Sequence, residues 1–197
     1  ARPASCAAAP TGVAADGVTQ RTTYVKNKGC FTWATNVRPS LRYYDGKWNR
    51  MIVGFNDKWT TQPVDLGSPS ASYLDASAKI YPFKKMTGNQ PADSTNKTVL
   101  VPNLFGNATT DPDAYWISFD WGRALASGTF YTGQPYSGTY EFVDTIMLLK
   151  VDHEVAPAEQ AYGKDNGCAD CHFSDQIDWT ALGLTKDPAT GGTQTLP

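Results

Sequence analysis

The pattern of apolar and polar residues is most regular between Tyr140 and His153, where it has the two-residue period of a β-strand. One side of this predicted strand carries Thr145, Met147, Leu149, Val151 and His153, and the other side carries Ile146, Leu148, Lys150 and Asp152. The first side is the more apolar, so we expect it to face the protein interior. His153 then lies on the inward side, at the end of the strand.

Shorter runs of β-branched and aromatic residues predict two hairpins. The first joins residues 22–25 to residues 31–34 through an Asn/Gly turn. The second joins residues 41–44 to residues 47–53 through the Asp-Gly dipeptide at 45–46. Asp-Gly is a signal for a two-residue turn, because both central residues of that turn need positive φ. Both hairpins are expected to be antiparallel.

Two further strands and one loop are predicted between residues 60 and 101. Residues 79–83 predict an edge strand, because Pro82 has no N–H group to donate to a neighbouring strand. Residues 96–101 predict another strand. Residues 60–77 are predicted to form a loop, since closely spaced Pro and Gly residues interrupt any regular element.

Two short helices are predicted from an aspartate at the start and a glycine at the end of each. The first begins after its cap Asp120, covers residues 121–126 and ends at Gly128. The second begins after Asp178 and ends at Gly183. Both are short enough to lie between strands or loops.

The composition favours a globular chain without long helices. The chain has 197 residues, of which 41% are hydrophobic, and its 17 Gly and 13 Pro residues break regular structure often. A net charge of −2 gives no reason to expect a nucleic-acid partner. No apolar run approaches the roughly 18–20 residues of a transmembrane helix. We predict an α+β fold with much irregular structure, in which short antiparallel strands or hairpins and a few short helices follow an extended arm at residues 1–21.

Residues Cys168 to His172 have the sequence Cys-Ala-Asp-Cys-His, which is the attachment motif of a c-type haem. In this motif the two thiols bond to the vinyl groups of one porphyrin, and the histidine becomes an axial ligand of the iron. A thioredoxin-like dithiol is disfavoured because a loop precedes the motif, and structural zinc because the other cysteines lack paired ligand spacing. We predict one covalent haem c in a domain formed by residues 22–197, bound through Cys168, Cys171 and His172.

Covalent haem attachment indicates a protein exported to the periplasm or the cell exterior. The other two cysteines, Cys6 and Cys30, fit the same environment, because a disulfide persists outside the cytosol. We predict that these two cysteines form a disulfide. The sequence opens at Ala1 without an apolar leader, and we expect that a signal peptide has already been removed.

The second axial position of the iron has three possible occupants. The chain has two histidines, so His153 is its one remaining histidine once His172 binds the iron. Met147 lies on the same inward side of the predicted strand, and a Met ligand would raise the reduction potential relative to a second His. A histidine from another chain is the third possibility. We predict His153 as the distal ligand, with Met147 as the alternative within this chain.

Several sequence blocks resemble the octahaem tetrathionate reductase family of multihaem c-type cytochromes. The blocks include Asn-Val-Arg-Pro at 36–39, Ala-Lys-Ile-Tyr-Pro-Phe at 78–83, Tyr-Ser-Gly-Thr-Tyr-Glu-Phe-Val at 136–143, His-Glu-Val-Ala-Pro at 153–157 and the Cys-x-x-Cys-His motif itself. They match the C-terminal part of that family, which carries its last haem, and the family's other haem motifs have no counterpart in this sequence. The resemblance implies a bis-histidine haem, with His153 as a candidate ligand.

We expect the chain to transfer electrons, because an iron with both axial positions filled by protein ligands has no site for a substrate. The expected partners are other multihaem cytochromes, or further copies of this chain arranged as a series of haems. One alternative is a small haem enzyme with an open distal site, acting on a sulfur or nitrogen oxyanion or on peroxide. Another is a structural subunit of a cytochrome assembly. No Arg/Lys/His cluster near the motif favours the enzyme.

Overall fold

The computed structural model of the chain describes residues 24–25, 29–30, 37–152 and 167–195, and it divides the chain into two units, residues 1–38 and 39–197. In the first unit, β1 (Tyr24–Val25) pairs antiparallel with β2 (Gly29–Cys30). A hairpin is therefore present, and its second strand begins earlier than predicted. The predicted domain boundary after residue 21 lies outside the described residues. So does Cys6, one half of the predicted disulfide.

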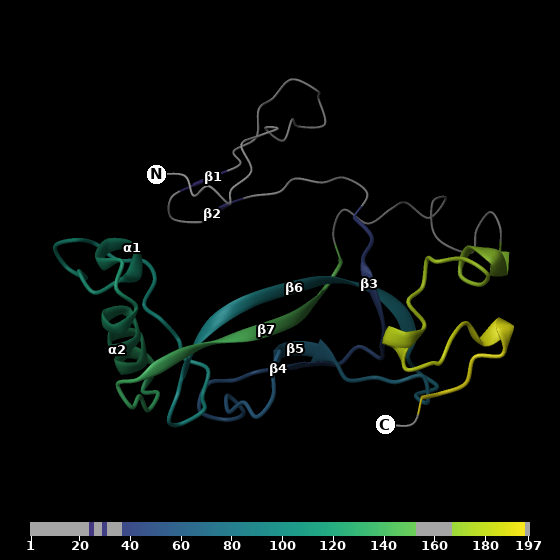
Figure 1. The fold of residues 1–197 in the computed structure, drawn as a ribbon, viewed down its shortest axis with the longest axis horizontal. Helices are drawn as coiled ribbons and strands as arrows, with labels where there is room; N and C mark the ends of the chain where they lie inside the picture. Colours follow the sequence, from purple (N-terminus) through teal and green to yellow (C-terminus); the bar gives the residue numbers. More distant parts are fainter. Residues whose placement is uncertain (1–23, 26–28, 31–36, 153–166, 196–197) are drawn as a thin grey trace, which may run out of the picture. The chain divides into compact units, whose positions relative to one another are not determined.

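The second unit is built on a five-stranded mixed sheet with the order β3-β6-β7-β5-β4 (Figure 1). Its strands are β3 (Ser40–Tyr44), β4 (Trp48–Arg50), β5 (Val64–Pro69), β6 (Lys79–Asp93) and β7 (Tyr140–Lys150). All neighbours are antiparallel except β5 and β7, which run parallel. The α+β class is confirmed. The expectation of short antiparallel strands alone is wrong, because β6 has 15 residues and β7 has 11.

The second predicted hairpin is wrong, because β3 and β4 do not pair with each other and lie at opposite edges of the sheet. The chain does turn at the Asp-Gly dipeptide, where the Asp45 carboxylate accepts a hydrogen bond from Lys47 N–H at 3.0 Å. Gly46 has a φ of +94°, whereas Asp45 is not among the residues with positive φ. A two-residue hairpin turn needs positive φ at both positions, so this turn leads the chain away from β3.

The loop predicted at 60–77 is wrong in part, because it contains β5. Gly67 lies within this strand as a packing residue and does not form a turn. A Cβ atom on Gly67 would lie 2.6 Å from Cζ2 of Trp48 in the neighbouring strand, so glycine lets the indole lie across β5. The Trp48 Nε1–H group donates a hydrogen bond to the Leu148 carbonyl of β7 at 2.8 Å. The position of β5 therefore depends on residues distant from it in sequence.

The predicted edge strand at 79–83 is the first third of the inner strand β6. Residues 79–83 pair with β3, and residues 83–93 pair with β7. Pro82 lies just beyond the β7 ladder, where its carbonyl accepts a hydrogen bond from Val151 N–H at 3.1 Å. Pro82 can therefore lie in an inner strand, because the ladder with β7 begins only at Phe83. The strand predicted at 96–101 is also wrong, since these residues form isolated bridges instead.

The described helices are α1 (Tyr115–Ser118) and α2 (Trp121–Thr132), which lie at one end of the β6–β7 pair (Figure 1). Asp120 caps α2 as predicted, and its carboxylate accepts a hydrogen bond from Arg123 N–H at 3.1 Å. The helix continues through Gly128, the predicted stop, and ends at Gly133, which has a φ of +68°. Gly128 is a packing residue, because a Cβ there would collide with the Val101 carbonyl.

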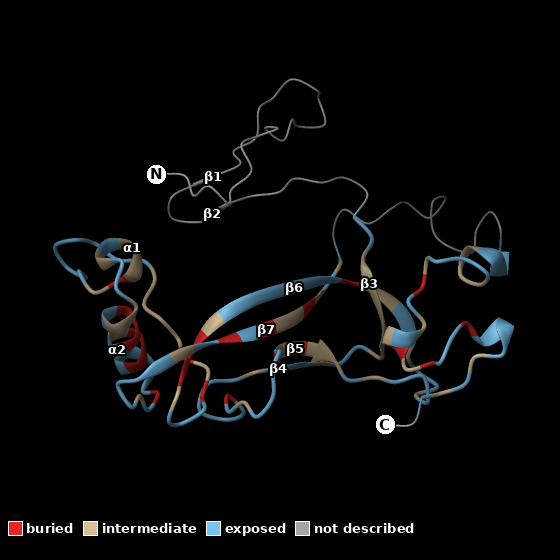
Figure 2. Ribbon diagram, viewed as in Figure 1, coloured by how far each residue is buried: buried red, intermediate tan, exposed pale blue. Residues whose placement is uncertain are grey.

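The apolar core is small and lies around β7 and α2, while much of β6 is exposed (Figure 2). One buried cluster joins Val64, Ala92 and Val143 from three strands or their ends. Thr145 is buried on the predicted inward side of β7, but Leu148, from the predicted outward side, is buried too. The side of β7 that is covered therefore changes along the strand. No helix in the described part of the chain has the length and apolar content required to cross a membrane.

Candidate haem attachment site

One helical turn in the C-terminal segment (residues 167–195) carries the side chains of the motif. The turn begins as a 3₁₀ helix, η2 (Gly167–Asp170). The Cys168 carbonyl accepts hydrogen bonds from Cys171 N–H at 3.2 Å and from His172 N–H at 2.8 Å. Both thiols and the imidazole thus project from a single turn of backbone. This is the arrangement that the predicted attachment to one porphyrin requires.

The two cysteines of the motif differ in their exposure to solvent. Both are free thiols, with Cys168 exposed and Cys171 half-buried. Burial, assisted by the charges of Asp170 and Cys168, raises the pKa of the Cys171 thiol. A redox-active dithiol contains a thiol with a lowered pKa, and Cys171 is not such a thiol. Zinc gains no support either, since no group of three or more His, Cys, Asp or Glu side chains in the described ranges is placed to bind a metal ion.

The imidazole of His172 is held by a carboxylate and an indole. Its Nδ1 atom lies 2.6 Å from Oδ1 of Asp187. Its ring lies nearly parallel to the indole of Trp179, with ring centroids 5.2 Å apart and an angle of 10° between the planes. No residue of the described ranges forms a hydrogen bond with Nε2, and 29% of the side chain is exposed. Nε2 is therefore the nitrogen that is available to a metal.

Asp187 is ionised at neutral pH because the surrounding backbone stabilises its charge. Burial works to raise the pKa of this carboxyl group, but hydrogen bonds from Phe173 N–H, from His172 and from Ala189 N–H outweigh burial and hold the pKa below its usual value. The two backbone bonds measure 2.8 Å each. An ionised carboxylate only accepts hydrogen bonds, so the proton between Asp187 and His172 belongs to Nδ1.

A closed loop fixes the position of Asp187. Thr185 N–H donates to the Thr193 carbonyl at 2.7 Å, and Gly192 N–H donates to the Asp187 carbonyl at 3.0 Å. Asp187 also caps a second 3₁₀ turn, η4 (Pro188–Thr190). Sequence reasoning missed Asp187 as a site residue. An aspartate followed by proline is a helix-start signal and would have identified the cap, although not its contact with His172.

A third 3₁₀ turn, η3 (Thr180–Leu182), connects this segment to the sheet by packing against β3. The predicted cap Asp178 accepts a hydrogen bond from Ala181 N–H at 3.0 Å, and Gly183 ends the turn with a φ of +83°. Hydrogen bonds from Thr180 and Ala181, with a smaller contribution from the charge of Arg42 on β3, lower the pKa of Asp178. The second predicted helix is therefore present as a 3₁₀ turn.

The structure brings together three of the five predicted site residues. Cys168, Cys171 and His172 share one turn, as described above. His153, the predicted distal ligand, lies outside the described residues. Met147, the alternative ligand, is half-buried in the middle of β7, aligned with Met86 of β6.

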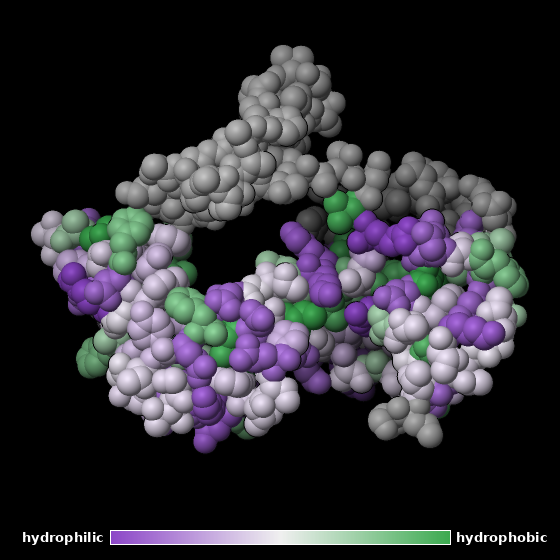
Figure 3. All heavy atoms as spheres, in the orientation of Figure 1, coloured by the Kyte–Doolittle hydropathy of each residue, from purple (hydrophilic) through white to green (hydrophobic). Residues whose placement is uncertain are grey.

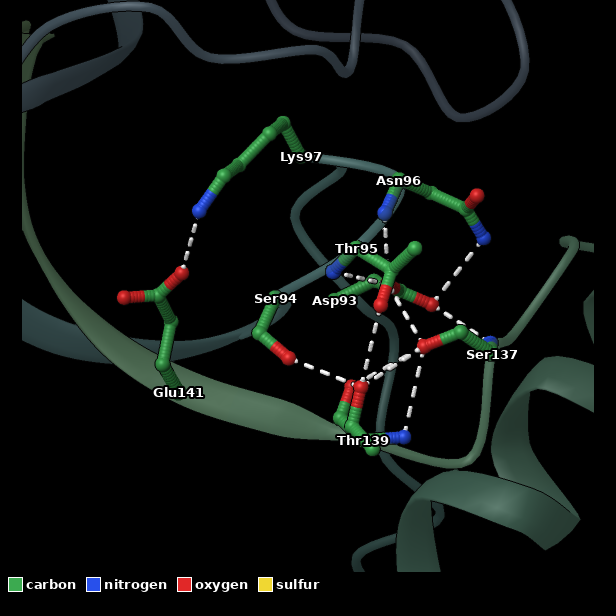
Figure 4. A network of polar contacts seen from close by, with 8 residues as sticks. All are labelled: Asp93, Ser94, Thr95, Asn96, Lys97, Ser137, Thr139 and Glu141. Carbon is green, nitrogen blue, oxygen red and sulfur yellow. Dashed lines mark hydrogen bonds and ion pairs between the residues drawn. The ribbon is translucent and has the colours of Figure 1, made fainter.

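A second polar cluster, around Asp93 at the end of β6, is a closed network (Figure 4). The Asp93 side chain is fully buried, and its carboxylate accepts hydrogen bonds from the backbone N–H groups of Thr95, Asn96 and Ser137 at 2.6–2.8 Å. The Ser137 hydroxyl donates a further bond at 2.8 Å. These donors all belong to the two chain segments that the network joins. The cluster therefore fixes a corner of the sheet and leaves no oxygen facing a ligand.

Comparisons with known proteins identify similarity to cytochromes c. A sequence model of the family described as bacterial cytochrome c matches residues 6–175. The crystal structure of an octaheme cytochrome c from Shewanella oneidensis is 35% identical in sequence and superposes with a TM-score of 0.70, covering 94% of this chain. The chain spans 41% of the length of that octaheme protein. No curated protein matches the chain in sequence.

Proposed function

This chain belongs to the bacterial cytochrome c family, and we propose that it is an exported electron carrier with one covalent haem c. The observation that carries the proposal is the turn from Cys168 to His172, in which two cysteines and a histidine lie on a single turn of backbone. Two cysteines that form thioether bonds to the porphyrin and one histidine that binds the iron are the side chains that attach a c-type haem. The residues present therefore fit this cofactor.

The two cysteines and the histidine of the turn have separate roles in the proposed carrier. Cys168 and Cys171 form the thioether bonds, and Nε2 of His172 binds the iron. The haem supplies one-electron redox chemistry when it is bound. The protein holds the imidazole in one orientation through Asp187 and Trp179.

We propose His153 as the distal ligand, with Met147 as the alternative. The support is the ligand inventory, because the chain has only two histidines and His172 takes the proximal position. An iron held by two protein ligands exchanges electrons without binding a substrate. This is why an electron carrier, rather than an enzyme, is the proposed function.

Replacement of the distal ligand tests this assignment. In the haem-loaded protein, His153→Ala should convert a low-spin ferric spectrum to one with high-spin character, and its ferrous form should bind carbon monoxide. Met147→Leu is the matched control and should leave the spectrum unchanged. A low-spin His153→Ala protein that excludes carbon monoxide would contradict the assignment. Carbon monoxide binding by the unaltered protein would favour a haem enzyme instead.

We also propose that the carrier docks on a multihaem cytochrome. The support is that the matched octaheme protein contains a region like this chain within a much longer chain, of which this one spans 41%. Phe105 and Phe119, on either side of α1 in the sequence, are also exposed, and Figure 3 shows hydrophobic residues at the surface of this end of the molecule. Sedimentation of the haem-loaded protein distinguishes this proposal from assembly of identical copies. A monomer fits the multihaem partner, whereas a concentration-dependent oligomer would favour self-assembly.

A further inference from the structure

The contact between His172 and Asp187 has a consequence for the proposed haem beyond its attachment. The carboxylate lies on the side of the ring opposite Nε2, at 2.6 Å from Nδ1, and 11% of its side-chain surface is exposed. A hydrogen bond in this partly buried position is weakly screened by solvent. The charge of Asp187 therefore acts on the imidazole directly.

A carboxylate that accepts the Nδ1 proton makes the imidazole a more electron-rich ligand. Carboxylate partners of this kind fix the tautomer of a metal-bound histidine and raise its basicity. A more basic axial ligand stabilises the ferric state over the ferrous state, because the ferric iron carries the higher charge. On the basis of the proposed haem attachment, we propose that Asp187 is a positioning residue that lowers the reduction potential of the haem through His172.

The hydrogen bonds around Asp187 hold its carboxylate in one position relative to the imidazole of His172. One carboxylate oxygen accepts from Phe173 N–H at 2.8 Å, and the other accepts from both His172 and Ala189. Phe173 has a φ of +60°, an unfavourable value for a large side chain. Asp187 therefore also sets the direction of the chain immediately after the ligand. Trp179 lies along the ring face and restricts rotation of the imidazole.

The test replaces the charge of Asp187 while keeping its shape. Asp187→Asn retains an oxygen that accepts from Nδ1 but removes the negative charge. In the haem-loaded protein, we expect the midpoint potential to rise enough to change the oxidised-to-reduced ratio about tenfold at fixed potential, or about 59 mV for one electron. Asp178→Asn is the matched control, because Asp178 caps a turn in the same segment and hydrogen-bonds Thr180 and Ala181 instead of His172. The control should leave the potential unchanged.

A second measurement on the unaltered protein does not depend on any variant folding. With ¹⁵N-labelled histidine, ferrous haem-loaded protein gives signals from only two imidazoles. His172 should show a protonated Nδ1 whose hydrogen exchanges slowly and resonates far downfield. A rapidly exchanging Nδ1 proton, or equal potentials for Asp187→Asn, Asp178→Asn and the unaltered protein, would overturn this inference alone. Purified protein without covalent haem would overturn the proposed function as well.

Discussion

The scaffold (residues 39–152) and the C-terminal segment hold their side chains in place by different means. In the scaffold, β6 and β7 pair continuously from Phe83 opposite Lys150 to Asp93 opposite Tyr140. In the C-terminal segment, the described helical elements are short 3₁₀ turns, and Asp178 and Asp187 accept hydrogen bonds at the starts of two of them, η3 and η4. The scaffold thus depends on many repeated backbone bonds, whereas the segment depends on a few side chains.

This difference predicts that the two regions respond differently to the loss of a side chain or of the haem. A ladder of backbone bonds tolerates the loss of one side chain, because its neighbours still hold the register. A segment of single turns has little apolar burial of its own, with Ile177, Leu182 and Leu184 as its buried apolar residues in the described range. We therefore expect the attached haem to contribute much of the order of the segment and little of the order of the scaffold.

The largest effect is expected from removal of haem attachment. Cys168→Ala combined with Cys171→Ala should abolish covalent haem completely, as intact mass measures. Amide hydrogen exchange should then become faster across residues 167–195 and stay slow in the β6–β7 ladder, because the ladder does not depend on the cofactor. Equal loss of protection in both regions would show that the contrast between them is wrong.

The next largest effect is expected at the buried network of the scaffold. Asp93→Ala leaves the N–H groups of Thr95, Asn96 and Ser137 without their acceptor, so the free energy of unfolding should fall by roughly 3 kcal/mol. Chemical denaturation monitored by tryptophan fluorescence measures this loss. Asp144→Ala is the control, since Asp144 is an exposed residue of β7, and its effect should be much smaller.

Acid should weaken the same corner of the scaffold. Burial works to raise the pKa of Asp93, but hydrogen bonds from Asn96, Ser137 and Thr95 outweigh burial and lower the pKa in the folded state. The stabilisation is therefore complete above the unfolded value of about 3.9 and is lost as the pH falls through the lower folded value. The unfolding free energies of the unaltered protein and of Asp93→Ala, measured from about pH 6 down to about pH 3, should differ by a constant amount above about pH 4 and approach each other below it.

A matched pair of helix caps gives a smaller effect in each region. Asp120→Ala removes the cap of α2, and Asp178→Ala removes the bond to Ala181 N–H; each should cost about 1 kcal/mol locally. The cost at Asp120 should lower global unfolding stability, because α2 is packed on the scaffold through Gly128. The loss at Asp178 should stay local and appear only as faster amide hydrogen exchange around η3, with no change in global unfolding stability. A global loss from Asp178→Ala would mean that the two regions unfold together.

The smallest effect is expected at Trp179. Its Nε1–H group is buried and has no hydrogen-bond partner among the described residues. Trp179→Phe removes this unpaired group and keeps an aromatic ring against His172, so the change in unfolding free energy should stay within about 1 kcal/mol. Thermal denaturation of the haem-loaded protein measures it. A much larger loss would reveal a partner for Nε1 that the described residues do not include.

Local signals in the sequence predicted some elements and failed at others for one physical reason. Asp120, Asp178 and Gly183 were predicted correctly, because a cap acts on backbone groups within the same turn. Gly128 and Gly67 were taken as stops or loop residues, although both are packing positions opposite residues that are distant in sequence. Short-range patterns do not distinguish a glycine that ends an element from one that admits a neighbour.

The chemistry of the site and the architecture around it were determined at different levels. The sequence alone predicts the attachment site, because two cysteines and a histidine with the spacing of a c-type haem motif lie within five consecutive residues, Cys168 to His172. Only the tertiary structure decided that β3 and β4 lie at opposite edges of the sheet. It also decided that Asp187, 15 residues after His172, reaches its imidazole. The spacing of the motif residues is a property of the sequence itself, whereas strand partners and ring contacts depend on how the whole chain packs.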